Sequence, residues 1–211
     1  MTLLPFYNQG QLEIGVDEAG RGPIFGRVYA GAVIWPSDLV TPIVQDSKKY
    51  TNINEREKAY DYILDHAIAY GIGYVEAKEI DTMGIYKAVM KAMNIAIRNT
   101  FIHPDHILVD GKYFLPDMDL LDHETCPQFT TIIDGDNKYL SIAAGSILAK
   151  VEHDRYINHL CDQYPLLERY DLQKNKGYGT PNHLKAIKEY GLTQFHRQSF
   201  KCCQGLPVIS I

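Results

Sequence analysis

The sequence lacks the features that mark several common classes of protein. Its 211 residues contain no apolar run close to the roughly 20 residues that a membrane-spanning helix needs. The first residues, MTLLPFYNQG, show no basic region followed by an apolar one, so no secretory signal is visible. The four cysteines form no C-x-x-C pair and no zinc-ligand spacing. We therefore expect a cytoplasmic protein without a membrane anchor or a zinc site.

The sequence also lacks the basic excess that nucleic-acid enzymes usually carry, since its formal net charge is −5. The charge is unevenly divided. Residues 1–136 hold 11 Lys/Arg and 20 Asp/Glu, a net of −9, and residues 137–211 hold 10 and 6, a net of +4. An acidic part that can hold cations beside a basic part that can hold phosphates fits a metal-dependent nuclease. A solvated acidic surface explains much of the excess equally well.

The patterns of apolar residues predict one α/β domain. A hydrophobic fraction of 45% and a charged fraction of 22% are ordinary for a globular chain of this length. Strands are predicted at 12–16, 28–35, 72–77, 106–110 and 129–133, and helices at 54–70, 85–99, 139–161 and 182–190. This order favours a mixed central β-sheet flanked by helices. Residues from about 164–211 would form a C-terminal helical extension of the single domain 1–211.

Acidic residues stand at the ends of three predicted strands. Asp17 and Glu18 follow LEIGV, Asp110 ends HILVD, and Asp134 and Asp136 follow FTTII. Each acid alone could be a solvated turn residue or a helix cap. Three such junctions favour a common cleft, because acids at the ends of neighbouring strands meet at one edge of a sheet.

Four clustered carboxylates would need a cation. They repel one another and would take up protons unless a positive charge joined them. Oxygen ligands select hard cations, so Mg²⁺ or Mn²⁺ is expected rather than zinc. Two such ions roughly 4 Å apart can activate water and stabilise the leaving oxygen of a phosphodiester. The acids therefore predict a site for two divalent ions.

Several ordered blocks of the sequence carry a family resemblance. They are IGVDEAGRGPIFGRVYAGAVI (14–34), DSKKYTNINERE (46–57), EIDTMGIYKAVMKAM (79–93), ILVDGKY (107–113), IDGDNKYLSIAAGSILAKVEHDRYI (133–157), NKGYGTPNHLKAI (175–187) and HRQSF (196–200). Together they closely resemble the type 2 ribonucleases H, the ribonuclease HII family. The resemblance spans most of the chain and implies a ribonuclease-H-like fold.

The resemblance implies which acids form the site. They are Asp17, Glu18, Asp110 and Asp136. Asp136 is preferred to Asp134 because the family's fourth acid shortly precedes the SIAA block. The same four residues would hold both divalent ions.

The resemblance also implies contacts with substrate. Gly20, Arg21 and Gly22 match a loop that reads the ribose 2′-hydroxyl through backbone groups. Tyr178 matches a tyrosine that packs against the sugar next to the cut, and Lys48 resembles a phosphate contact. Without the family, Tyr178 would be interpreted as a core residue and Lys48 as a solvated lysine.

Other residues are expected to have structural roles. The histidines that could suggest a general base, His153, His183 and His196, are expected in the core or on the surface. Arg197 is expected to tie down the C-terminal segment. The sequence departs from the family at Phe25 and Arg27, which follow the glycine loop closely enough to alter affinity. It departs also at His153 and at Gly145, a glycine that costs a helix about 1 kcal/mol relative to alanine.

The implied activity is endonucleolytic. It would hydrolyse RNA in RNA–DNA hybrids and single ribonucleotides in duplex DNA, by two-metal-ion catalysis that leaves 3′-hydroxyl and 5′-phosphate ends. The alternative is a non-catalytic nucleic-acid-binding subunit of the same fold, which would be free to lose its acids. The short segment before Asp17 and the GRG loop favour type 2 over the type 3 relative. The C-terminal QGLPVISI lacks the paired aromatics of a clamp-binding tail, so we expect a monomer without an obligatory protein partner.

Overall fold

A mixed sheet forms the centre of the molecule. The computed structural model describes residues 2–121 and 127–211. The strands are β1 (Glu13–Ala19), β2 (Val28–Ile34), β3 (Ala69–Val75), β4 (His106–Asp110) and β5 (Gln128–Ile132), arranged in the order β3-β2-β1-β4-β5. β2 pairs antiparallel with β1 and β3, whereas β1, β4 and β5 are parallel. The carboxyl ends of these three parallel strands therefore meet at one edge.

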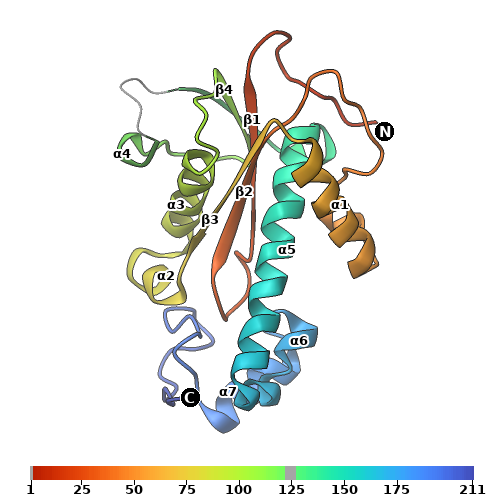
Figure 1. Cartoon of the computed structure of the whole chain (residues 1–211). Coiled ribbons are helices and arrows are strands. Elements are labelled where there is room, and N and C mark those ends of the chain that lie inside the picture. The colour runs from red at the N-terminus through yellow and green to blue at the C-terminus, as the bar shows by residue number, and fades with distance from the viewer. Residues whose placement is uncertain (1, 122–126) are drawn as a thin grey trace.

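Helices cover both faces of the sheet (Figure 1). On one face, α5 (Leu140–Gln163) lies along β1 and β2, with α1 (Ile53–His66) beside it. On the other face, α3 (Ile85–Arg98) packs on β2 and β3, next to α2 (Ala77–Met83) and α4 (Met118–Leu121). Within the described ranges, no helix is long and apolar enough to cross a membrane.

The C-terminal segment packs against the far end of α5. It contains α6 (Leu172–Asn175) and α7 (Pro181–Tyr190), and Figure 1 shows both helices at that end of α5. Short 3-10 helices occur at η1 (Ser47–Lys49), η2 (Gly135–Asn137) and η3 (Pro165–Tyr170). A separate apolar cluster joins Phe25, which follows the glycine loop, to Ile157 of α5 and Ile187 of α7. This cluster fixes the C-terminal segment beside the loop that follows β1.

Glycines allow α5 to approach the sheet closely. A Cβ on Gly15 of β1 would lie 2.3 Å from the backbone nitrogen of Ile142, and one on Gly31 of β2 would lie 2.3 Å from the carbonyl oxygen of Gly145. A Cβ on Gly145 would itself lie 2.7 Å from the carbonyl oxygen of Gly31. The glycine that weakens α5 locally therefore lets its backbone contact β2.

Two predicted boundaries are wrong at the end of α1. The helix predicted over 54–70 ends at His66. The strand predicted to begin at 72 is β3, which begins at Ala69 and therefore contains Tyr70. The N–H of Ile68 already bonds to the carbonyl of Ile34, so pairing with β2 overrides the helical pattern. The side chain of Asn52 caps the helix.

The structure also extends β1 beyond its predicted end. The strand was predicted to stop before Asp17, but it continues to Ala19 because Asp17 and Glu18 pair with Gly31 and Ala30 of β2. The two acids thus lie within the strand and point to opposite faces.

Replacing Gly15 with alanine should lower the free energy of unfolding by roughly 1–3 kcal/mol, because the added Cβ must push the backbone of α5 away from β1. Urea denaturation measures this change. Gly179→Ala is a matched control, since a Cβ there would make only ordinary contacts at 3.5 Å or more. Equal stability of the two variants would contradict the close approach.

Candidate active site

Three parallel strands carry the predicted acids to one edge of the sheet. Asp17 and Glu18 lie on β1, Asp110 ends β4, and Asp136 lies in η2, shortly after β5. Asp17 is 4% exposed and Asp136 is 2% exposed. Asp134, the acid not chosen, is exposed and has a left-handed backbone (φ 53°). The structure therefore brings together the four acids that the sequence singles out.

A pocket of about 260 Å³ opens beside these acids, and most of the predicted site residues line it. They include three acids, the glycine loop, the lysine of η1 and the tyrosine: Asp17, Glu18, Gly20, Arg21, Gly22, Lys48, Asp110 and Tyr178. Asp136 lies next to the pocket, because the Nζ of Lys48 is 3.2 Å from its Oδ2. All nine predicted residues are therefore neighbours.

Burial and like charge make the acids hard to ionise. Burial raises the pKa of Asp17 well above its ordinary value, and the charges of Glu18 and Asp110 raise it further. Burial also raises the pKa of Glu18, although the guanidinium of Arg21, 3.8 Å away, opposes this. Burial is thus the main reason that the two acids resist ionisation, and repulsion between carboxylates adds to it.

Polar contacts also fix the other two acids. The N–H of Gly135 donates to Oδ1 of Asp110 at 2.7 Å, which offsets part of the rise that burial causes in the pKa of Asp110. Burial alone would lower the pKa of Lys48, but the carboxylate of Asp136 raises it. In the part of the chain described, no three His, Cys, Asp or Glu side chains are already arranged around a common metal position. The carboxylates therefore lie near one another but do not surround a common metal position.

The loop that follows β1 presents backbone to the pocket. Gly20 has φ +84°, and a Cβ there would lie 2.5 Å from Cδ2 of His153. A Cβ on Gly22 would lie 3.1 Å from Cε1 of Tyr178. Gly20 therefore has both the backbone conformation and the close contact that favour glycine, and Gly22 lets the tyrosine ring lie tightly against the loop.

A buried guanidinium holds this loop. Arg197 is fully buried and donates hydrogen bonds of 2.6–3.1 Å to the carbonyl oxygens of Gly20, Arg21, Pro23, Gly26 and Arg27. Burial lowers its pKa to about 10, so it keeps its charge at neutral pH. The predicted structural role is confirmed, and the partner of the C-terminal segment is the loop after β1.

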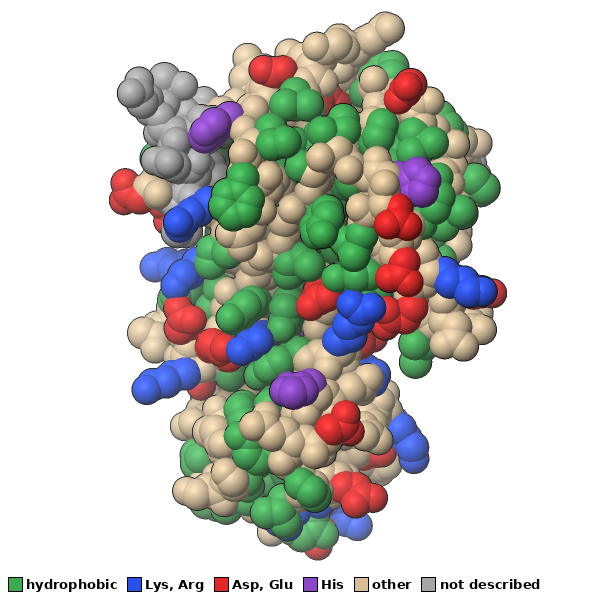
Figure 2. Space-filling model, in the orientation of Figure 1, with side chains coloured by type: hydrophobic (Ala, Val, Ile, Leu, Met, Phe, Trp, Pro, Cys, Tyr) green, Lys and Arg blue, Asp and Glu red, His purple; other side chains and the backbone are tan. Residues whose placement is uncertain are grey.

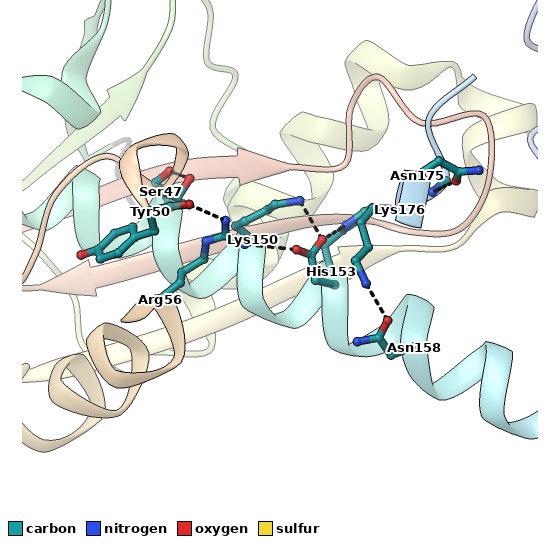
Figure 3. Close-up of polar contacts among 11 residues, drawn as sticks. Ser47, Tyr50, Arg56, Lys150, His153, Asn158, Asn175 and Lys176 are labelled. Carbon is teal, nitrogen blue, oxygen red and sulfur yellow. Dashed lines mark hydrogen bonds and ion pairs between the residues drawn. The ribbon is translucent and has the colours of Figure 1, made fainter. Parts of the chain in front are cut away.

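Cations that the sequence analysis missed stand along the same pocket. Arg56 of α1 and Lys150 of α5 line it, and both contact the carboxylate of Asp154, at 3.2 and 2.7 Å (Figure 3). Ser146, which also lines the pocket, lies four residues before Lys150 on the same side of α5. That spacing is the one signal in the sequence that could have identified this lysine. Figure 2 shows acidic and basic side chains interleaved across the middle of the molecule.

Two of the departures from the family pattern, Phe25 and Arg27, lie outside the lining of the pocket. Phe25 is buried and its ring lies 4.9 Å from that of His196. Arg27 pairs with Glu76 at 2.6 Å, with its guanidinium between the rings of Tyr74 and Tyr156. Neither is among the described residues that line the pocket. Any effect of Phe25 and Arg27 on the affinity for substrate would therefore act through the loop that joins them to β1.

The fold and the acid-lined pocket define a class of protein. The solved structure of the ribonuclease H2 from Pyrococcus horikoshii is similar, with a TM-score of 0.73 and 26% sequence identity, over 90% of this chain and 94% of that one. This chain therefore has a ribonuclease-H-like α/β fold, which confirms the mixed sheet flanked by helices that the sequence predicts.

The family is narrower than the fold. The family model for ribonuclease HII matches residues 14–203. The ribonuclease HII of Bacteroides thetaiotaomicron is 43% identical over 198 residues, 94% of each chain, and that of Phocaeicola vulgatus is 42% identical over 209 residues, 99% of this chain and 98% of that one. The chain belongs to the ribonuclease HII family. It is a ribonuclease H, an endonuclease that hydrolyses phosphodiester bonds.

Replacing Asp17 with asparagine should raise the melting temperature without divalent ions, by roughly 2–4 °C for each kcal/mol of repulsion removed. Because the pKa of Asp17 is raised in the folded state, ionisation at neutral pH costs stability. The gain should be largest above that raised pKa and shrink as the pH falls through it, since protonation removes the same charge.

Differential scanning calorimetry over a pH series measures this gain. Asp61→Asn, at an exposed position on α1, is the control and should change stability by less than about 0.5 kcal/mol at every pH. A melting temperature that falls in the Asp17 variant at neutral pH would show that the buried carboxylate is stabilising.

Proposed function

We propose that this ribonuclease cuts RNA in RNA–DNA hybrids and single ribonucleotides embedded in duplex DNA. The observation that carries the proposal is one pocket in which buried acids with raised pKa values lie beside a glycine loop and an exposed tyrosine. The acids suit hydrolysis of a phosphodiester. The loop and the tyrosine suit recognition of a sugar.

The donor set fits hard divalent cations. Asp17, Glu18, Asp110 and Asp136 offer only oxygen atoms, and their excess negative charge would be neutralised by Mg²⁺ or Mn²⁺. Two such ions, when bound, would activate a water molecule and stabilise the leaving oxygen. The four acids would hold these ions beside the pocket that three of them line.

Cations around the pocket would contact the phosphates of the substrate. Lys48 reaches the acids from η1, and Arg56 and Lys150 line the same pocket from α1 and α5. We assign the segment 164–211 to substrate binding as well, because it supplies Tyr178 and belongs to the part of the chain with a net charge of +4.

The glycine loop would read the 2′-hydroxyl. That group both donates and accepts hydrogen bonds, and it alone distinguishes one ribonucleotide from its DNA neighbours. Gly20 and Gly22 line the pocket with backbone alone, since neither carries a side chain. The ring of Tyr178, 46% exposed and packed against Gly22, would contact the adjoining sugar.

The proposed cleavage is on the 5′ side of the ribonucleotide. Water attacks the phosphorus, the bond to the 3′-oxygen of the preceding nucleotide breaks, and that oxygen takes a proton. The products are a 3′-hydroxyl and a 5′-phosphate. This cleavage cannot give a cyclic phosphate, because the leaving sugar is a deoxyribose without a 2′-hydroxyl.

Asp136→Asn should lower the cleavage rate by at least about 1000-fold, the scale on which members of a catalytic unit act. The test uses the purified chain with Mg²⁺ and a labelled duplex containing one ribonucleotide, so it also tests action without a protein partner. Asp134→Asn is the matched control two residues away and should retain activity, because its side chain is exposed. A chelator should abolish cleavage, and Mg²⁺ or Mn²⁺ should restore it.

Two results would contradict the proposal. Substantial activity of purified Asp136→Asn would remove that acid from the site. Binding without cleavage by the unaltered chain, with either metal, would favour the non-catalytic subunit.

Tyr178→Ala should lose about tenfold more activity on a single ribonucleotide in DNA than on a full hybrid, because only the former needs the junction with a DNA sugar to be recognised. The measurement compares kcat/KM on the two labelled duplexes and identifies the product ends. Equal losses on both substrates, or cyclic-phosphate ends, would overturn this account of recognition.

A further inference from the structure

Two buried histidines stand behind Tyr178. His183 of α7 and His196 of the segment after it are both fully buried. Nδ1 of His183 lies 2.9 Å from the carbonyl oxygen of Tyr178, and the Nε2 atoms of the two histidines are 3.1 Å apart. Nδ1 of His196 lies 2.9 Å from the backbone nitrogen of Thr193. These contacts form one continuous chain.

Backbone groups at its two ends fix the direction of every hydrogen bond. The N–H of Thr193 can only donate, so Nδ1 of His196 accepts and the proton of that neutral ring is on Nε2. It donates to Nε2 of His183, whose own proton is therefore on Nδ1 and donated to the carbonyl of Tyr178. Both rings stay neutral, because burial lowers the pKa of His183 and lowers that of His196 to about 3.

The chain ends at the backbone from which the tyrosine ring projects. The carbonyl oxygen of Tyr178 accepts from Nδ1 of His183 and also from the N–H of Thr180, at 2.8 Å. Two donors on one oxygen fix the orientation of this peptide group. The ring then lies against Gly22.

The other end of the chain joins the element that holds the glycine loop. His196 is followed directly by Arg197, whose guanidinium binds the carbonyls of that loop. The ring of His196 also contacts those of Phe25 and Tyr170, which restrict its movement. One dipeptide thus sets both sides of the sugar-recognition site.

We propose that His183 and His196 are positioning residues that set substrate selectivity by fixing Tyr178 opposite the Gly20–Gly22 loop. Neither is among the described residues that line the pocket, so they act through Tyr178 and not on the substrate. The inference rests on the proposed role of Tyr178 in recognising the junction.

Two substitutions of His183 separate positioning from packing. The amide nitrogen of His183→Asn can replace Nδ1 and keep the donation to Tyr178, but it leaves the buried Nε2–H of His196 unpaired. His183→Gln can accept from His196 but loses the donation to Tyr178. We therefore expect the Asn variant to be the less stable of the two and to keep its selectivity for the single ribonucleotide. We expect the Gln variant to lose selectivity by about tenfold, the scale of one buried hydrogen bond.

Selectivity is the ratio of kcat/KM on the single-ribonucleotide duplex to that on the full hybrid, and stability is measured by thermal unfolding. In a Tyr178→Ala background, His183→Gln should change the ratio no further. If Tyr178→Ala alone leaves the ratio unchanged, the proposed recognition by Tyr178 is wrong. If it lowers the ratio but His183→Gln does not, the positioning role is wrong.

The unaltered chain gives a test that needs no variant to fold. Ring ¹⁵N chemical shifts report which nitrogen of a neutral histidine carries the proton. We expect Nδ1–H for His183 and Nε2–H for His196 across neutral pH. A proton on Nε2 of His183 would break the chain at Tyr178 and overturn the inference.

Discussion

The site depends on one buried guanidinium and the five carbonyl oxygens around it. Arg197 uses all five of its N–H groups on the loop from Gly20 to Arg27, so its charge is fully hydrogen-bonded. Without such partners, a buried charge would cost several kcal/mol. The loop has no regular secondary structure to hold it, and its glycines leave its backbone free. The arginine holds the loop in one conformation, and it comes from a segment about 175 residues further along the chain.

A second constraint is electrostatic and works against stability. Three parallel strands place acids at one edge, where burial and mutual repulsion raise the pKa values of Asp17, Glu18 and Asp110. The close approach of α5 to β1 at Gly15 adds to the burial of Asp17. The sheet and helix that stabilise the domain thus force negative charges together. The packing of the surrounding fold holds these acids together despite their repulsion. Binding a cation would offset the stability that this repulsion costs.

The sequence predicts the parts of this arrangement that local patterns encode. Acids after apolar runs indicated the carboxyl-terminal parts of β4 and β5 and, too early, the end of β1, and the family blocks favoured Asp136 over its exposed neighbour. Local patterns predicted the wrong structure where tertiary contacts determine it. Tyr70 continues a helical pattern in the sequence, but it pairs with β2 as part of β3. It also could not find Arg56, which reaches the pocket from α1, or the contact between His183 and His196. The position of Arg56 depends on the packing of α1 on α5, and the histidine contact depends on the folded C-terminal segment.

The apparent conflict between an acidic protein and a polyanionic substrate disappears at the scale of the pocket. Charges more than about 8 Å apart are largely screened at physiological ionic strength, so the net charge of −5 has little influence on a bound phosphate. A phosphate in the pocket would interact mainly with the charges that line it, which are Lys48, Arg56 and Lys150 together with the acids. Because the acids lie at the strand ends and these cations on η1, α1 and α5, a sugar–phosphate backbone in the pocket would face both. The uneven distribution of charge along the chain therefore matters less than the elements that fold these few side chains together.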